Sequence, residues 1–158
     1  MNIFEVSELT RRNRTEQAYV LYWFRHPDKG SAFERNTRYA RWLPGWIILR
    51  LIQKLRYNGF LFYECDEFIG HVFFQAHPRE WRVFSILSTV EGKGHAQRML
   101  AEFLCRAHEV SHLTGVRIGA GGNKAIHHIW EKTVNGKLNG VIFPLKAGVV
   151  PGTIEFVR

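Results

Sequence analysis

The chain has 158 residues, of which 46% are apolar and 14% aromatic, so it can bury one hydrophobic core and is too short for two ordinary domains. Its two cysteines lack the spacing of a metal site or a disulfide framework, and no apolar run reaches the length of a membrane span. We therefore expect a single domain over residues 1–158, without a metal, and a cytoplasmic location because no signal peptide opens the chain.

The net charge of +8 is concentrated in residues 11–57, where eleven Lys and Arg residues face three Asp and Glu residues. Nine aromatic side chains are interleaved with them. Arginines beside flat rings favour a nucleic-acid surface, since guanidinium groups bind phosphates and rings stack on exposed bases. The same pattern also fits amphipathic helices that pack their aromatic residues inward and leave their arginines in water. Both interpretations stay open.

One strand and two helices are predicted in the first part of the chain. Residues 3–6 form a short β-prone run, and residues 16–24 have helical periodicity. Residues 46–57 place a row of Ile and Leu side chains on one side of a second helix. Proline and glycine residues interrupt the stretch between the two helices, which we expect to be loop.

Three β-prone runs follow, at residues 60–64, 68–74 and 81–88. Residues 65–67 separate the first two as a hairpin turn, and a Pro-containing turn precedes the third. Consecutive strands joined by short turns favour an antiparallel meander.

A glycine turn, residues 90–96, separates the third of these strands from a helix predicted over residues 96–110. The order strand, turn, helix points unpaired backbone N–H groups and the positive end of the helix dipole at whatever lies over the turn. Gly92 and Gly94 carry no Cβ to block that approach, and Lys93 adds a positive charge. The pattern predicts a phosphate site, although such a turn can also simply connect a strand to a helix.

Past this helix we predict a strand at residues 116–120, a turn at 121–123, a helix at 124–132 and strands at 140–143 and 153–157. The expected fold is α/β (α+β): a mixed, mostly antiparallel sheet of six or seven strands with about four helices.

Two segments resemble motifs of the GNAT superfamily of N-acetyltransferases. Residues 91–96, Glu-Gly-Lys-Gly-His-Ala, resemble its acetyl-CoA signature Gln/Arg-x-x-Gly-x-Gly/Ala, with Glu91 in the place of Gln or Arg. Residues 123–132 resemble its Asn-x-x-Ala-x-x-x-Tyr-Glu-Lys helix, with Ile126 and Trp130 in the places of Ala and Tyr. The order of the predicted elements agrees with that family, in which the two helices after the first strand border the acceptor groove.

The resemblance implies acetyl-CoA as acyl donor and transfer of the acetyl group to an amine. A backbone N–H near residues 86–88 would polarise the thioester carbonyl. The cofactor-binding positions that it implies are Ile86, Leu87, Ser88, Glu91, Gly92, Lys93, Gly94, His95, Ala96 and Asn123.

Catalytic side chains are harder to assign. The family's Tyr protonates the leaving thiolate, whereas Trp130 can donate a hydrogen bond but has no accessible acidic proton. His127 or His128, one turn away, would then supply the proton, unless these imidazoles are simply solvated. Glu64, or Ser88 through a water, is the candidate base, although a strand-end Glu is also an ordinary surface residue. His71 and His77 receive no role.

The acceptor is left open between an amine-bearing small molecule, a peptide and an aminoacyl-tRNA, with the basic helices on the acceptor side. We also consider a homodimer. An alternative function is a nucleic-acid-binding protein whose GNAT fold is catalytically degenerate, or a GNAT-like enzyme that modifies nucleic acid.

Overall fold

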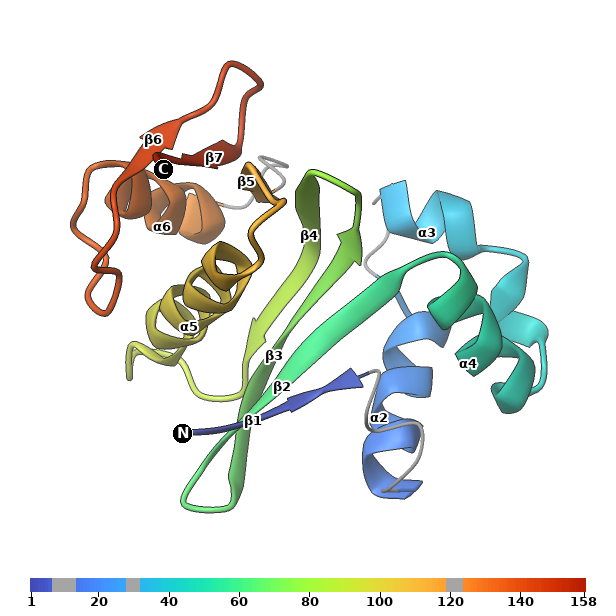
Figure 1. Cartoon of the computed structure of the whole chain (residues 1–158). Helices are drawn as coiled ribbons and strands as arrows, with labels where there is room; N and C mark the ends of the chain where they lie inside the picture. Colours follow the sequence, from blue (N-terminus) through green and yellow to red (C-terminus); the bar gives the residue numbers. More distant parts are fainter. Residues whose placement is uncertain (7–13, 28–31, 119–123) are drawn as a thin grey trace.

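The computed structural model describes residues 1–6, 14–27, 32–118 and 124–158 (Figure 1). Within these ranges seven strands form one sheet, in the order β1-β2-β3-β4-β5-β7-β6. Their bounds are β1 Asn2–Glu5, β2 Tyr57–Glu64, β3 Glu67–Ala76, β4 Glu80–Ser88, β5 Gly115–Ile118, β6 Leu145–Ala147 and β7 Thr153–Phe156. All neighbouring pairs are antiparallel except β4 and β5, which are parallel. The predicted mixed, mostly antiparallel sheet and its β2–β4 meander are confirmed.

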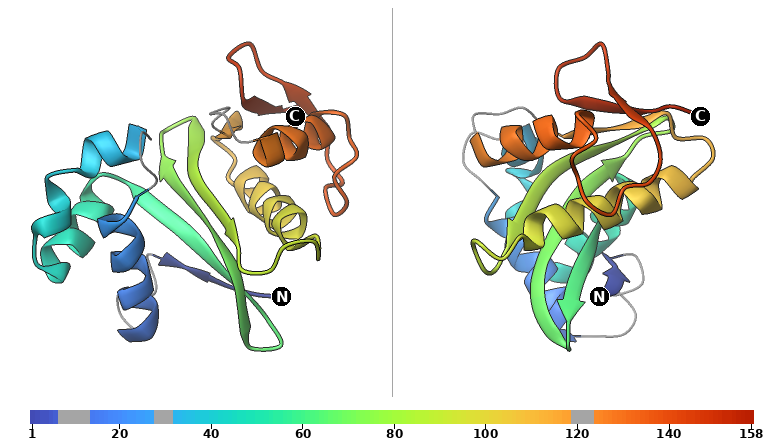
Figure 2. Two further views of the ribbon diagram at one scale, coloured as in Figure 1. Left: turned by 180° about the vertical axis from the view of Figure 1, so that it is seen from behind. Right: turned by 90° about the vertical axis from the view of Figure 1, so that its left-hand side faces the viewer.

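Helices cover both faces of this sheet. Figure 2 shows α2, α3 and α4 on one face and α5 and α6 on the other. The helical bounds are α2 Arg14–Arg25, α3 Ala32–Thr37, α4 Gly45–Lys54, α5 His95–Glu109 and α6 Lys124–Val134, with a short 3-10 helix, η1, at Ala40–Trp42. Neither α3 nor η1 was predicted. Helix α4 ends earlier than predicted because Arg56 takes a left-handed conformation, φ +59°, that turns the chain into β2.

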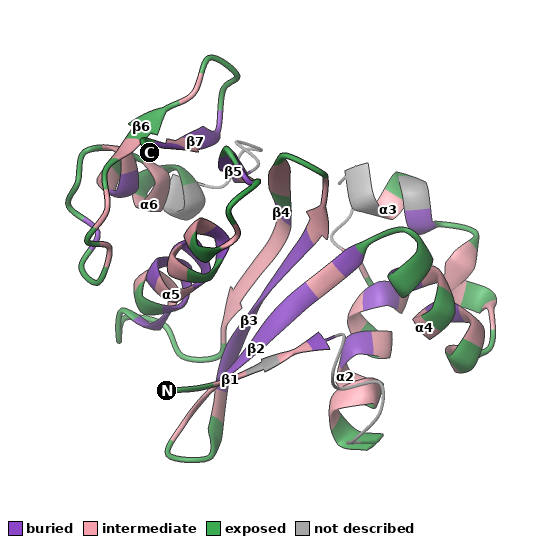
Figure 3. Ribbon diagram, in the orientation of Figure 1, coloured by how far each residue is buried: buried purple, intermediate pink, exposed green. Residues whose placement is uncertain are grey.

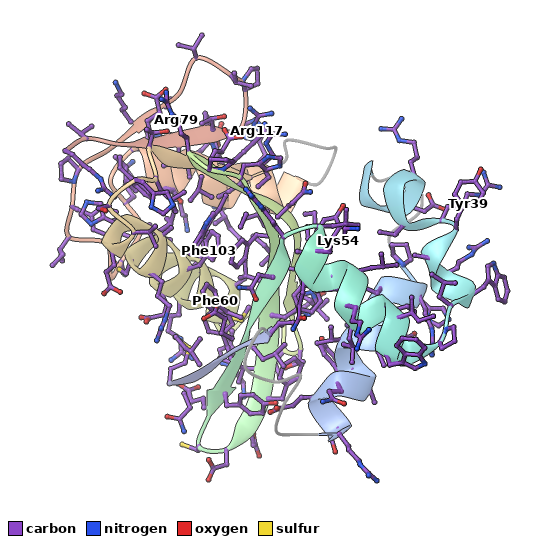
Figure 4. All side chains as sticks on the ribbon, turned by 45° about the vertical axis from the view of Figure 1, so that its right-hand side comes forward. Tyr39, Lys54, Phe60, Arg79, Phe103 and Arg117 are labelled. Atoms are coloured by element: carbon purple, nitrogen blue, oxygen red, sulfur yellow. The ribbon has the colours of Figure 1, made fainter. Side chains whose placement is uncertain are left out.

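Two hydrophobic cores result from the alternation of side chains along the central strands. On the α5 side, Phe60 and Phe62 of β2 pack with Phe103 of α5, and the rings of Phe60 and Phe103 lie 6.0 Å apart (Figure 4). On the α2 side, the next residues along β2 and β3, Leu61 and Phe73, pack under α2 and α4. Figure 3 shows β2 and β3 as the most continuously buried strands. The sheet is therefore anchored from both faces at its centre.

The strand predicted at residues 140–143 is wrong. This segment is irregular, and the strand β6 begins only at Leu145. Phe143 packs on the core instead, with its ring stacked 4.0 Å from that of His108, while Ile142 is 97% exposed. Pro144 has no N–H for a ladder, so pairing with β7 starts after it. Val141 and Phe143 therefore pack against the core although residues 140–143 do not pair as a strand.

Other sequence predictions fall partly on residues outside the described ranges. The strand predicted at 116–120 is found as β5, and its last two residues lie outside them. So does Asn123, the implied cofactor residue before α6. In the part of the chain that is described, no helix is long and apolar enough to span a membrane.

Candidate active site

Strands β4 and β5 are parallel neighbours at their first residues. They pair over only four positions, from Glu80↔Gly115 to Val83↔Ile118. Two contacts hold this paired end: Arg117 Nη2 donates to Glu80 at 3.3 Å, and the Thr114 N–H donates to the Arg79 carbonyl at 2.8 Å (Figure 4). Beyond Val83, β4 has no described strand on its β5 side. Residues 119–123, which follow β5, lie outside the described ranges, so among the described residues the second half of β4 has no strand partner on this side.

A β-bulge lies on β4 directly after its last described pair with β5. Phe73 of β3 pairs with Ser85, but Phe74 pairs with Val83, so Phe84 is an extra residue on β4. Bulges bend a strand and re-aim its side chains. Here Phe84 and Ser85 both lie on the α2 side, because Phe84 packs in that core and the Ser85 hydroxyl is bonded to His71 beneath α2.

The glycine turn follows β4 directly. Gly92 and Gly94 have φ of +78° and +71°, and a Cβ on either would meet nothing within 4 Å. Gly94 is the N-cap of α5 and has no side chain to cap the helix, so the first N–H groups of α5 face this open space. Unpaired N–H groups at a helix start bind anions. The structure thus confirms the predicted order of strand, turn and helix, with room above the turn.

The start of α5 also contains a buried ring nitrogen without a partner among the described residues. His95, its first residue, is 8% exposed at its side chain, and its Nδ1 has no hydrogen-bond partner among the described residues. Lys93 and Glu91 are exposed on the turn. Ser88 does not point free into the site, because its hydroxyl donates to the Val90 carbonyl at 2.9 Å and so shapes the turn.

Glu64 lies beside this turn, at the end of β2. Arg98 of α5 donates to both of its carboxylate oxygens, at 2.6 and 2.9 Å, and His95 Nε2 lies 3.8 Å away. The bond from Arg98 holds the pKa of Glu64 below its ordinary value. A carboxylate in such an ion pair is a weak base. The positive charge of Arg98 is likewise paired with Glu64 and is not free to bind a ligand.

A buried hydrogen-bonded chain connects α2 to the bulge of β4. His71 of β3 is fully buried, with Nδ1 2.8 Å from the Tyr19 hydroxyl and Nε2 2.8 Å from Ser85 Oγ. Burial lowers the pKa of His71 to about 3 and raises that of Tyr19 to about 12. Both side chains are therefore neutral near pH 7. The sequence did not predict these hydrogen bonds, and the one pattern that could have indicated them was a His within an aromatic strand.

Solved N-acetyltransferases share this architecture along nearly the whole chain. N-acetyltransferase PseH of Campylobacter jejuni, in complex with acetyl coenzyme A, is 14% identical with a TM-score of 0.59, covering 99% of this chain and 97% of that one. Tetrahymena GCN5 is 15% identical with a TM-score of 0.55, covering 100% and 97%. The protein has the GNAT fold. Spermidine N-acetyltransferase from Vibrio cholerae, in complex with CoA and spermine, is 14% identical with a TM-score of 0.55, covering 99% and 86%.

Among the comparisons with known proteins, those with solved structures support the GNAT fold. No family model and no curated protein matches the sequence. Likeness at such low identity establishes the fold, and the residues of the site must support an activity by themselves.

On α6 of this GNAT fold, Trp130 differs from the neighbouring histidines. Its side chain packs against the core, and its Nε1 is buried without an acceptor in the described structure. His127 is exposed, with Nε2 3.9 Å from Glu131, and His128 is exposed as well. Among the described residues no group of His, Cys, Asp and Glu could hold a metal ion. The Nε1–H of Trp130 is therefore a donor without an acceptor among the described residues, and it could donate to an atom of a bound ligand.

Most of the predicted cofactor residues are neighbours in sequence, while Asn123 lies outside the described ranges. Ile86, Leu87 and Ser88 end β4, and residues 91–96 form the turn and the start of α5. The catalytic candidates are divided, because Glu64 and Ser88 lie at the turn, while His128 and Trp130 lie on α6. Their roles stay predictions.

Proposed function

We propose that this protein is an acyl-CoA-dependent N-acetyltransferase, which transfers an acetyl group from acetyl-CoA to an amine. The observation that carries the proposal is the glycine turn, which no side chain caps and which follows the half of β4 that has no described neighbour on its β5 side. This combination offers hydrogen bonds to an extended amide-containing chain and then to its phosphates, in that order. Structural neighbours in complex with acetyl coenzyme A or with CoA support the same ligand.

The residues present fit such a ligand. The N–H groups at the start of α5 and the exposed Lys93 would hold the pyrophosphate, and the buried His95 Nδ1 is a further unused polar atom there. Backbone groups of Ile86, Leu87 and Ser88 would pair with the pantetheine arm. Glu91 adds an unfavourable charge, but it is exposed, so solvent screens its effect. Asn123 stays a predicted contact.

Acetyl-CoA supplies an acyl group activated as a thioester. Transfer forms a bond between the amine nitrogen and the acetyl carbon and breaks the carbon–sulfur bond, so the amine loses a proton and the thiolate must be stabilised or protonated. A backbone N–H on the second half of β4 is suited to hydrogen-bond the thioester oxygen. Trp130 Nε1–H is suited to stabilise the thiolate, with His128 as the candidate proton donor.

The proton of the amine has no strong side-chain acceptor in this proposal. Glu64 is held by Arg98, and the Ser88 hydroxyl is bonded to Val90. His71 is too weakly basic to accept it, and we assign it the positioning of Ser85 at the bulge. The acceptor amine would then react in its deprotonated form and release its proton to water, so the rate of transfer should rise with pH.

Thiol release tests this proposal. The purified protein is incubated with acetyl-CoA and a panel of polyamines, peptides and aminoacyl-tRNA, and free CoA thiol is followed together with the mass of the acceptor. We expect thiol release that requires one class of amine and is matched by acetylated product. Acetyl-CoA binding without amine-dependent thiol release across the panel would contradict acetyl transfer.

That contradictory result is what the second candidate function predicts. A protein with this fold that binds nucleic acid without catalysis is favoured by Trp130, which cannot act as an acid, and by Glu91 in the turn. The two candidates differ in turnover, so the thiol assay separates them. The acceptor and a homodimeric state stay predictions.

A further inference from the structure

The outer helical layer exposes four large aromatic side chains. Tyr22 is 57% exposed, Tyr39 85%, Trp42 82% and Trp46 62%. Figure 4 shows Tyr39 pointing away from the body of the protein. Inward packing explains the buried Phe24 and Tyr57 of the same basic stretch, but not these four. Such a concentration of exposed rings marks an interaction surface.

Arginines lie directly on two of these rings. The guanidinium carbon of Arg41 is 5.3 Å from the ring centre of Trp42, and that of Arg50 is 5.5 Å from the ring centre of Trp46. Neither arginine takes part in any of the ion pairs formed among the described residues. The surface therefore combines flat rings with positive charge that no described carboxylate neutralises.

A pocket of about 490 Å³ opens beside Trp42. It is lined by Arg25, His26, Arg41 and Trp42. Arg41 Nε is buried and has no hydrogen-bond acceptor in the described part of the chain. Arg25 is fixed at the wall by a bond from its Nη2 to the Leu43 carbonyl at 3.2 Å. Two guanidinium groups, one of which has an Nε–H without an acceptor, line one hollow, and this suits a phosphate.

We propose that this aromatic–arginine surface, formed by Tyr22, Arg25, Arg41, Trp42, Trp46 and Arg50, binds single-stranded nucleic acid. A phosphate enters the pocket between Arg25 and Arg41, and bases stack on Trp42 and Trp46. Stacking requires unpaired bases, which excludes a regular duplex as the preferred ligand. The surface belongs to the helices on the face opposite α5 (Figure 2), and the binding that we propose there requires no acetyl transfer.

Fluorescence anisotropy with labelled uridine and thymidine oligomers, and with a duplex, tests the surface over a series of salt concentrations. The full-length wild type should bind both single strands more tightly than the duplex. Trp42→Ala/Trp46→Ala should weaken single-strand binding by roughly 5-fold or more, as expected when base stacking is lost. Arg41→Gln should lower the slope of log affinity against log salt by about 0.7, the value for one phosphate contact.

Control variants come from exposed positions outside the surface. Ile142→Ala removes an exposed apolar side chain, and Lys137→Gln removes an exposed charge. Both should bind oligomers like the wild type, and all variants should keep wild-type circular dichroism. Failure of the wild type to bind any oligomer would overturn the proposal. So would equal affinity for the duplex with no effect of the tryptophans, equal effects of the control variants, or a self-associated protein that the double Trp variant dissociates.

Discussion

His71 Nε2 lies 2.8 Å from Ser85 Oγ, which ties an uncharged, buried imidazole to the bulge that follows the last described pair of β4 with β5. The other ring nitrogen is bonded to the hydroxyl of Tyr19, so helix α2 is connected through β3 to the edge of the candidate active site. Two hydrogen bonds among the side chains of Tyr19, His71 and Ser85 therefore join α2 to the bulge of β4.

Removing the imidazole should destabilise the fold. His71→Ala leaves a cavity next to Phe73 and two hydroxyls without their partner, so we expect a loss of about 3 kcal/mol in the free energy of unfolding. Tyr19→Phe keeps the ring and removes one bond, which should lose about 1 kcal/mol. Urea unfolding measures both. A loss below about 0.5 kcal/mol for His71→Ala, typical of a surface substitution, would contradict the assigned burial.

The same residue predicts a pH dependence of stability. The folded pKa of His71, about 3, is below its ordinary value of 6.5, so between these values the unfolded chain binds a proton at His71 and the folded protein does not. The free energy of unfolding therefore keeps its full value above pH 6.5 and falls as the pH is lowered towards 3, with a slope of up to about 1.4 kcal/mol per pH unit. The difference between the wild type and His71→Gln isolates the contribution of His71. Parallel stability curves for the two proteins would show that His71 does not titrate this way.

Glu64→Gln distinguishes a structural carboxylate from a catalytic one. Loss of a general base lowers turnover by about 10²- to 10⁴-fold. If Glu64 serves only as the partner of Arg98, the variant should change kcat by less than about 10-fold, well short of that loss. Arg98→Gln breaks the same ion pair and is the matched control. A loss of activity in Glu64→Gln alone, with a flattened pH–rate profile, would restore Glu64 as the base.

Trp130 separates acid catalysis from hydrogen bonding. Trp130→Phe removes the unused Nε1–H, so kcat should fall by roughly 10-fold or more, because a donor to developing charge is lost. Affinity for acetyl-CoA should stay close to that of the wild type. Trp130→Tyr supplies a hydroxyl with a pKa near 10 and should raise kcat above that of Trp130→Phe. Equal kcat for Trp130→Phe and the wild type would remove Trp130 from the reaction.

Local sequence signals were sufficient for most of the fold. The period of apolar residues predicted α5 and the central strands, and two glycines between them predicted the turn, because each of these features depends on neighbours in the chain. The segment at residues 140–143 was mispredicted for the same reason: alternating apolar residues look like a strand even where tertiary packing of Phe143 replaces pairing.

The interior of the candidate site depends on register and could not be predicted. His71 meets Ser85 because of a bulge on β4, and it meets Tyr19 across 52 positions of sequence. Residues 11–57 left two interpretations, and the structure buries some of their aromatic side chains and exposes others, so nucleic-acid binding stays a proposal.

Calorimetric titration with acetyl-CoA tests the central claim most directly. Gly94→Glu places a carboxylate in the open space over the turn, whereas Gly136→Glu adds the same group at a matched glycine after α6, with φ +66° and nothing within 4 Å of its Cβ. We predict a dissociation constant in the micromolar range for the wild type and for Gly136→Glu, and no measurable binding by Gly94→Glu. Absence of binding by the wild type, or unchanged binding by Gly94→Glu, would contradict an acetyl-CoA site at the glycine turn.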